Sequence, residues 1–196
     1  MKVFYKIVSI ICLVILLSSC GGQEVIQNQL NWSLEDFEYT NQFGEPFGKK
    51  DLQGKVWIAN FIFTNCNTVC PPITANMARL QRLIDKEGLD NVALVSYSVD
   101  PEVDTPEILQ KFASKFTENQ KNWYFLTGYV QEHIEQFAKE NFRFFIQKIE
   151  GQDQVSHGTD LFLIDQSGTI VKSYDAIDVP YEEILNDIII LLKNNK

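Results

Sequence analysis

The chain has few of the residues that cross-link proteins or bind metals, and no long apolar run. Its 196 residues include only four cysteines and two histidines. The longest apolar run, from Ile7 to Leu17, is broken only by Ser9. That run is about half of the roughly 20 residues that a membrane-spanning helix needs, so a transmembrane segment is not favoured.

Basic residues are also scarce, because 17 Lys and Arg stand against 26 Asp and Glu, a formal net charge of −9. Nucleic-acid-binding proteins carry basic surfaces, so the acidic balance argues against a nucleic-acid partner. The sequence shows no internal repeat and no low-complexity tract. Its length fits one domain with a sizeable core.

The N-terminus is typical of an export signal. Two early lysines precede the apolar run, which ends at Leu17-Ser18-Ser19-Cys20. This end resembles the lipobox of bacterial lipoproteins, whose peptide is cut before a cysteine that then carries acyl chains. The alternative is an ordinary cleaved signal that happens to contain a cysteine. We predict a signal peptide over 1–19, lipidation of Cys20, a polar tether over 20–31, and anchoring on the extracytoplasmic side of a bacterial membrane.

This processing leaves one cysteine pair with free sulfur. Cys12 leaves with the signal and Cys20 is used by the lipid, so only Cys66 and Cys70 remain. In an oxidising compartment an isolated close pair forms either a disulfide or a metal clamp.

The apolar pattern predicts alternating strands and helices after about Trp32. A hairpin is expected over 37–47, strands over 55–63, 92–99, 123–126, 142–149, 161–165 and 169–174, and helices from Pro71 or Pro72 to Gly88, after Asp104, around 130–138 and over 180–193. This order predicts an α/β thioredoxin-like fold over 32–196. A central mixed sheet would be flanked by helices, with an N-terminal hairpin and an inserted strand-helix unit.

The cysteine pair lies between a predicted buried strand and the start of a helix. The positive end of a helix favours thiolate, the form that binds metals and attacks disulfides. Three residues separate Cys66 from Cys70. That spacing permits a disulfide and also lets both sulfurs spread around one ion. Two thiolates suit copper(I) or zinc better than a hard cation.

A third ligand would have to come from one of the two histidines. His133 lies beside the apolar stripe of a predicted helix, where a surface or boundary histidine is the expected interpretation. His157 precedes the strand 161–164, and in thioredoxin-like folds the loop entering that strand faces the cysteine loop. Gly158 permits a close backbone approach there. Structural zinc normally has four protein ligands, so a set of two sulfurs and one nitrogen suits copper better.

Three blocks of the sequence together resemble the Sco/SenC family: Phe63-Thr64-Asn65-Cys66-Asn67-Thr68-Val69-Cys70-Pro71, then Ser98-Val99-Asp100-Pro101-Glu102-Val103-Asp104-Thr105-Pro106, and His157 followed by Leu161-Phe162-Leu163-Ile164-Asp165. The resemblance implies a thioredoxin-like fold that binds one copper ion, Cu(I) or Cu(II), through Cys66, Cys70 and His157. It also implies a role in assembling the CuA centre of cytochrome c oxidase. The implied partners are the CuA subunit and a copper donor protein.

Two functions fit this resemblance. The first is a non-enzymatic copper metallochaperone. The second is a thiol-disulfide oxidoreductase that keeps the CuA-site cysteines reduced, with Cys66 attacking a disulfide and Cys70 resolving it. A thioredoxin would carry a proline in the loop before the 161–164 strand, and none lies there, so general disulfide reduction is less favoured.

The second block also carries two acidic residues, Asp100 and Asp104, that match acidic positions of the family and are candidates for a supporting role around the site. The favoured interpretation of both is structural, because such residues commonly end strands and begin helices. Many family members have an aspartate before the ligand histidine, where this chain has Ser156. The position before His157 therefore supplies no carboxylate that could orient the imidazole.

Two further interpretations remain open. Thr64, two residues before Cys66, is faintly like the active site of thiol peroxidases, but the activating arginine and proline-rich approach of those enzymes are absent. A structural lipoprotein with one disulfide is the non-catalytic alternative, and it would leave His157 without a role.

Overall fold

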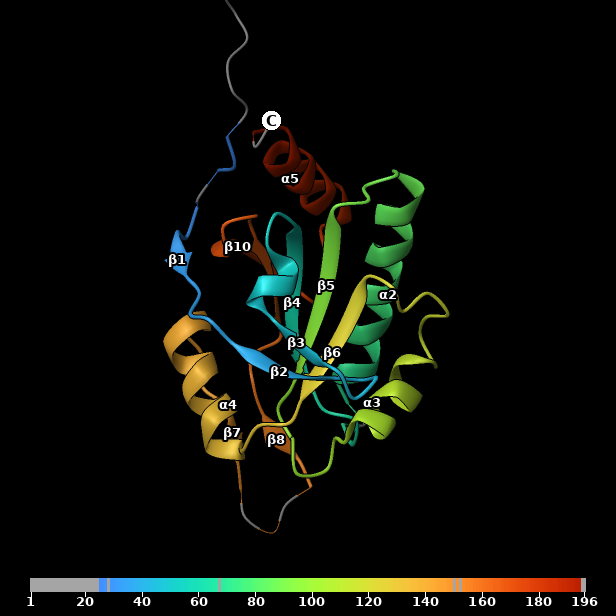
Figure 1. The fold of residues 1–196 in the computed structure, drawn as a ribbon, viewed down its shortest axis with the longest axis vertical. Coiled ribbons are helices and arrows are strands. Elements are labelled where there is room, and N and C mark those ends of the chain that lie inside the picture. Colours follow the sequence, from blue (N-terminus) through green and yellow to red (C-terminus); the bar gives the residue numbers. More distant parts are fainter. Residues whose placement is uncertain (1–24, 28, 67, 150, 152, 195–196) are drawn as a thin grey trace, which may run out of the picture.

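The computed structural model describes residues 25–194 apart from positions 28, 67, 150 and 152. The predicted signal peptide and Cys20 lie outside the described residues. Within them, an eight-stranded sheet has the order β1-β10-β9-β4-β5-β6-β2-β3 (Figure 1). Its strands are β1 (Trp32–Ser33), β2 (Glu38–Asn41), β3 (Pro46–Gly48), β4 (Val56–Ile62), β5 (Val92–Ser98), β6 (Trp123–Thr127), β9 (Asp160–Ile164) and β10 (Thr169–Asp175).

The two central strands, β4 and β5, are parallel and in register, with Ile58 opposite Leu94. All seven residues of each are buried, as expected where helices cover both faces of a sheet. On either side, β9 pairs antiparallel with β4 and β6 pairs parallel with β5. The sheet is therefore mixed, as predicted, and β4 delivers the chain directly to the cysteine loop.

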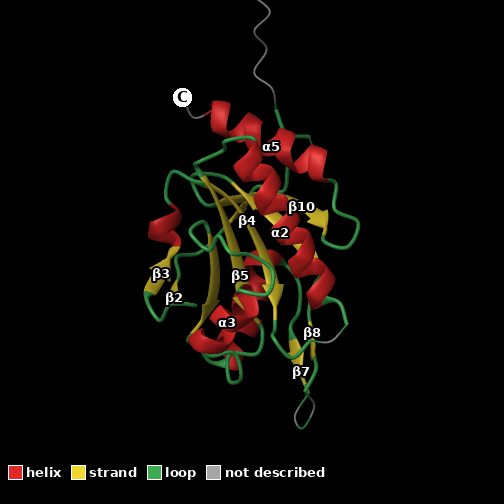
Figure 2. Cartoon of the chain, turned by 90° about the vertical axis from the view of Figure 1, so that its right-hand side faces the viewer, coloured by secondary structure: helices red, strands yellow, loops and turns green. Residues whose placement is uncertain are grey.

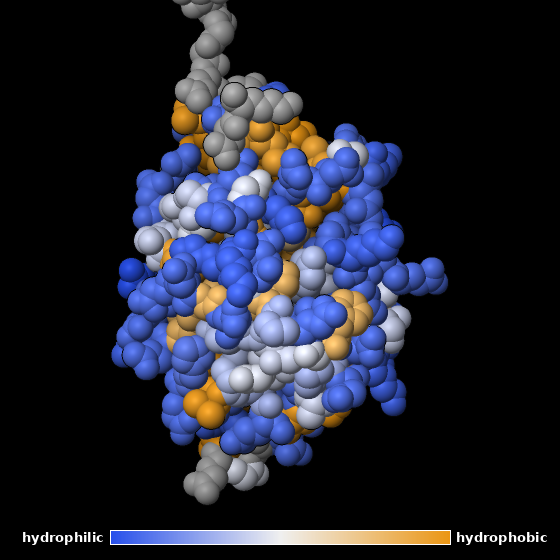
Figure 3. Space-filling view, in the orientation of Figure 1, coloured by the Kyte–Doolittle hydropathy of each residue, from blue (hydrophilic) through white to orange (hydrophobic). Residues whose placement is uncertain are grey.

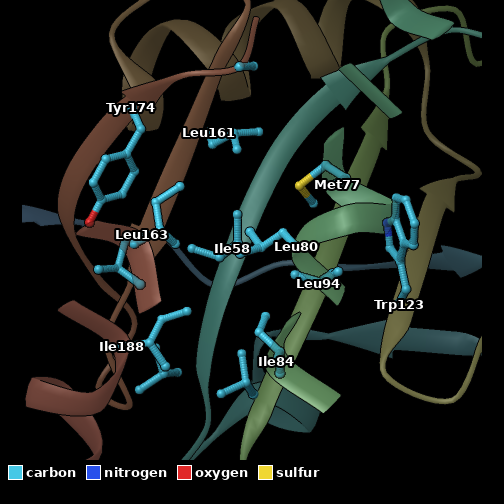
Figure 4. Close-up of a cluster of buried hydrophobic side chains, with 14 of the residues drawn as sticks. Ile58, Met77, Leu80, Ile84, Leu94, Trp123, Leu161, Leu163, Tyr174 and Ile188 are labelled. Carbon is cyan, nitrogen blue, oxygen red and sulfur yellow. The ribbon is translucent and has the colours of Figure 1, made fainter. Parts of the chain in front are cut away.

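Helices cover both faces of this sheet. They are η1 (Lys49–Leu52), α2 (Cys70–Lys86), α3 (Pro106–Ala113), α4 (Gln131–Phe137), η2 (Ala138–Phe142) and α5 (Tyr181–Asn194). Helices α2, α3 and α5 pack on one face (Figure 2), where Met77 and Ile84 of α2 and Ile188 of α5 meet Ile58 of β4 and Leu163 of β9 (Figure 4). The other face carries α4, η2 and an aromatic-rich cluster. This is the thioredoxin-like arrangement that the sequence predicts.

Helix α2 begins at the second cysteine, Cys70, slightly earlier than predicted. Pro71 and Pro72 lie in its first turn. Prolines are tolerated there because the first N–H groups of a helix have no intrahelical partner. The helix closes before Gly88, whose φ of +67° is the left-handed conformation typical of a residue just past a helix end.

The strand predicted over 142–149 is wrong. That segment starts with the last residue of the π-helical turn η2, and Arg143 follows in the left-handed region. Only β7 (Gln147–Lys148) is extended, and it pairs with β8 (Val155–Ser156) in a separate two-stranded hairpin. The apolar residues of the segment anchor it to the aromatic cluster instead of building the sheet: Phe142 and Ile146 are buried there.

The β7–β8 hairpin extends from the end of the molecule opposite α5 (Figure 1). At the other end, the last part of the predicted tether contacts the domain, because Ile26 is buried in the core and the N–H of Leu30 donates to the carbonyl of Val171. The view in Figure 3 is largely hydrophilic, with apolar surface concentrated near α5. None of the described helices is long and apolar enough to cross a membrane.

Candidate metal and thiol site

The two cysteines lie side by side, where β4 gives way to α2. Both are free thiols; Cys66 is 6% exposed and Cys70 is fully buried. The backbone N–H of Cys70 donates to Sγ of Cys66 over 3.3 Å. The hydroxyl of Thr68 lies 3.7 Å from the same sulfur. The sulfur of Cys66 is thus surrounded by donors at the start of a helix, as the sequence predicts.

These donors make the two thiols unequal. Burial acts to raise the pKa of Cys66, but hydrogen bonds from Cys70 and Thr68 outweigh it, so its pKa lies below the ordinary value. Burial raises the pKa of Cys70 far above the ordinary value, and its hydrogen bond to Cys66 raises it further. Cys66 is therefore the thiol that ionises first, and Cys70 keeps its proton in the metal-free reduced protein.

His157 lies between β8 and β9 and points at the buried cysteine. Its Nε2 is 3.8 Å from Sγ of Cys70, and its Nδ1 is 2.7 Å from the carbonyl oxygen of Gly158. A carbonyl only accepts, so Nδ1 carries the proton and, in the neutral ring, Nε2 presents its lone pair to the sulfur. Burial lowers the pKa of His157, which favours that neutral ring. This is the form that binds a metal.

The separation of Cys70 and His157 suits one bound ion. With metal-sulfur and metal-nitrogen bonds of about 2.3 and 2.0 Å, sulfur and nitrogen ligands lie about 3.5–3.7 Å apart for tetrahedral or trigonal angles. The observed 3.8 Å is close to this range. Among the described residues, no group of three His, Cys, Asp or Glu side chains is already gathered as a metal cluster. A site with Cys66, Cys70 and His157 as ligands therefore requires their side chains to move closer around one ion.

A shallow pocket of about 190 Å³ opens beside this pair. It is lined by Phe63, Cys66, Thr68, Val69, Gln154, Val155, Ser156 and His157. A larger hollow of about 660 Å³ lies elsewhere, between η1 and the turn that joins β9 to β10, and none of the predicted ligands lines it. The smaller pocket is the one that is lined by Cys66 and His157.

The other histidine, His133, packs against aromatic residues. His133 is on the exposed side of α4, and its Nε2 lies 2.8 Å from the hydroxyl of Tyr39. Its ring stacks on Phe137, within the aromatic cluster. This agrees with the interpretation of His133 as a boundary histidine.

Asp104 does not cap α3, although its position in the sequence suggests that role; the cap is Thr105, whose Oγ1 accepts from the N–H of Ile108. Asp104 is fully buried, and its carboxylate accepts from the hydroxyl of Ser98 over 2.6 Å. It also accepts from both the hydroxyl and the backbone N–H of Thr64. Asp104 thus holds the chain two residues before Cys66.

Asp100 forms an ion pair with the β7–β8 hairpin, which precedes His157. Its carboxylate is 2.7 Å from Nζ of Lys148, which also lies 2.8 Å from the carboxylate of Glu102. Lys148 belongs to β7, and the sequence offers no signal for this pair, because it lies in the segment predicted wrongly as a sheet strand.

Gly158 makes the close backbone approach that the sequence predicts, and its neighbour is an aromatic ring. A Cβ atom at this position would lie 3.0 Å from the ring of Phe144. The ring of Phe63 meets the imidazole of His157 edge to face, with 5.8 Å between centroids. Phe63 therefore packs against the imidazole of His157, and Phe144 packs against the residue that follows it.

Comparison with known proteins gives a consistent result. The family model described as SCO1/SenC matches residues 27–193 of this chain. A SCO1/SenC family lipoprotein from Bacillus anthracis has a solved structure that superposes with a TM-score of 0.83. Its sequence is 54% identical, and the match covers 85% of this chain and 99% of that one.

Two further solved structures carry functional descriptions. BsSco, described as a Sco-family cytochrome c oxidase assembly protein with a disulfide switch, is 41% identical with a TM-score of 0.79, over 86% of this chain and 98% of that one. ScoI of Bradyrhizobium japonicum was solved with copper bound; it is 26% identical with a TM-score of 0.67, over 83% of this chain and 98% of that one.

Proposed function

The chain belongs to the SCO1/SenC family, and from this premise we propose that it is a copper metallochaperone that takes part in cytochrome c oxidase assembly. One observation carries the proposal: Nε2 of His157, with its tautomer set by Gly158, lies 3.8 Å from Sγ of Cys70. The copper bound by a family member and the oxidase-assembly description of another support the choice of metal and process.

In this proposal copper is the cargo, and Cys66, Cys70 and His157 hold it. Hydrogen bonds lower the pKa of Cys66, so this thiol ionises more readily than an ordinary cysteine and supplies the first thiolate. Cys70 gives up its proton when the ion binds, because a metal stabilises the thiolate that burial disfavours. His157 needs no proton release, since burial already keeps it neutral. Two thiolates and an imidazole form a soft ligand set, which suits copper.

We further propose that the protein acts at a membrane surface. The sequence Leu17-Ser18-Ser19-Cys20 supports export and lipidation of Cys20, and a lipoprotein in the same family supports the same address. The partners would be a protein that donates copper and the CuA subunit that receives it. The exposed β7–β8 hairpin and the pocket beside Cys66 leave the site open to such proteins.

Copper binding by the full-length protein in mild detergent tests the ligand set. We expect one copper per chain and a thiolate-to-copper(II) absorption band. His157→Ala should weaken binding by more than the about 10–100-fold that loss of a ligand's supporting residue commonly costs. His133→Ala is the matched control and should bind as the wild type does. Equal binding by the two histidine variants would exclude His157 as a ligand.

The pKa of Cys66 is lowered and that of Cys70 is raised, and this difference favours a second function, reduction of the oxidised CuA-site cysteines. The Cys66 thiolate attacks the target disulfide, forms a mixed disulfide and releases one target thiol after protonation. Cys70, once deprotonated, attacks the sulfur of Cys66 and releases the second target thiol. Two electrons pass to the target, and a Cys66–Cys70 disulfide remains.

A kinetic experiment separates this function from copper delivery. Reduction of a CuA-domain disulfide by the reduced protein should be abolished by Cys66→Ser and should persist in His157→Ala. Reduction that survives Cys66→Ser would refute the mechanism. In cells that lack the gene, rescue of oxidase activity by added copper would favour delivery, and failure of copper to rescue it would favour reduction.

A further inference from the structure

The two halves of the proposed copper site are joined by one short loop. This loop, residues 99–105 between β5 and α3, is called here the β5–α3 loop. Its Asp104 is bound to Thr64, just before the cysteines, and its Asp100 is bound to Lys148, in the hairpin that precedes His157. The chain just before Cys66 and the hairpin that precedes His157 therefore both contact the β5–α3 loop.

The histidine side depends on Lys148 through strand pairing. In the β7–β8 hairpin Lys148 is opposite Val155, and Gln147 is opposite Ser156, the residue directly before His157. A ladder of two residue pairs is too short to be stable by itself. Because β8 leads into His157 and pairs with β7, an interaction that fixes Lys148 also fixes β8.

The ion pairs of Lys148 with Asp100 and Glu102 can fix the hairpin in this way. The Lys148 side chain is 21% exposed and that of Asp100 only 3%, so water screens this pair less than an exposed one. Hydrogen bonds to Asp100 and Glu102 raise the pKa of Lys148, so it stays charged. A polar link also runs directly from the hairpin to the cysteine loop, where the side-chain amide of Gln154 donates to the carbonyl of Asn65, but it is exposed and 3.3 Å long.

We propose that Lys148 is a positioning residue of the copper site: its ion pairs with Asp100 and Glu102 fix the β7–β8 hairpin to the β5–α3 loop and thereby set the distance from His157 to Cys70. This inference rests on the proposed function, because it assigns Lys148 a role in copper affinity. Lys148 contacts neither the proposed ligands nor the pocket, so it acts only through the hairpin.

The test is copper(II) binding by full-length Lys148→Met in mild detergent. We expect about 10–100-fold weaker binding, the usual effect of removing a residue that orients a metal ligand. The nitrogen coupling of His157 should weaken in the electron paramagnetic resonance spectrum, while the Cys66–Cys70 reduction potential stays unchanged. Lys172→Met is the matched control, because Lys172 also bridges one buried and one exposed carboxylate, Asp187 and Glu183, at 2.6 and 2.7 Å. It should bind copper as the wild type does.

Two more variants separate positioning from loss of stability. Lys148→Arg keeps the charge and should restore most of the affinity. The double variant Lys148→Met with Asp100→Asn removes the unpaired buried carboxylate and should remain weak in copper binding. Recovery of affinity in the double variant, or wild-type affinity in Lys148→Met, would overturn the inference. A wild-type protein that binds no copper would instead overturn the proposed function.

Discussion

Replacing Asp104 tests how the cysteine loop is held. The carboxylate accepts three hydrogen bonds, from the hydroxyl of Ser98 and from the hydroxyl and backbone N–H of Thr64. Asp104→Ala removes both acceptor oxygens, and with them all three hydrogen bonds, and leaves a small cavity. Asp104→Asn keeps one acceptor oxygen and nearly the same volume. The two variants therefore separate the contribution of the hydrogen bonds from that of the charge.

The expected free energies of unfolding follow from these contacts. Each donor left without a partner in a buried site costs about 1–3 kcal/mol, and hydroxyls can rotate toward other acceptors, so Asp104→Ala should lose about 3–5 kcal/mol. Asp104→Asn should lose about 1 kcal/mol at pH 7, because burial already disfavours the charged form of the carboxyl group. For a urea slope near 2 kcal/mol/M, the alanine variant's midpoint should fall by about 2 M.

The pH dependence of this effect has a definite sign. Burial raises the pKa of Asp104, so the folded protein binds this proton more tightly than the unfolded chain does. The stabilisation from this group is complete below the ordinary aspartate pKa and is lost as the pH rises through the raised value. Asp104→Asn should remove this part of the pH dependence. Equal losses for the alanine and asparagine variants at pH 7, or an unchanged pH profile, would refute the argument.

Other residues around the site give further predictions. Gly158→Ala should weaken copper binding several-fold with little change in thiol reactivity, because its Cβ would meet the Phe144 ring at 3.0 Å; wild-type affinity in a copper titration would contradict this. Tyr97→Phe should raise the free energy of unfolding by about 1 kcal/mol, since the Tyr97 hydroxyl is buried and has no hydrogen-bond partner among the described residues; urea unfolding that shows a loss would argue against it. Burial lowers the pKa of His157, so its contribution to stability is present above the ordinary histidine pKa and is lost as the pH falls; thermal unfolding of His157→Gln should depend less on pH between 7 and 5.

Much of the fold could be predicted from local pattern. The apolar run that became β4 is buried on both faces, and continuous apolar runs of that length are typical of central strands. Ile73, Met77, Leu80 and Ile84 recur at helical spacing in the sequence, and all four are buried on one face of α2. In both cases the signal lies in residues close in sequence that share one environment.

The segment over 142–149 shows where local pattern is insufficient. Phe142 and Ile146 are buried, whereas Phe145 is 73% exposed. A π-helical turn and a left-handed Arg143 turn the chain in this region, so these residues reach the aromatic cluster without forming a strand. Apolar content alone does not distinguish such an anchor from a short buried strand.

The two aspartates of the second block show the same limit at the site itself. The run Asp104-Thr105-Pro106 has the composition of a helix start, and Thr105 does cap α3. Its neighbour Asp104 instead binds Thr64, forty positions earlier in the chain. The capping pattern accounts for one residue and misleads about the next, because the partner of a buried carboxylate is chosen by the packing of distant segments. The role of an acidic residue near a metal site therefore becomes clear only once its hydrogen-bond or ion-pair partner is known. For Asp100 that partner is Lys148, which no sequence pattern indicated.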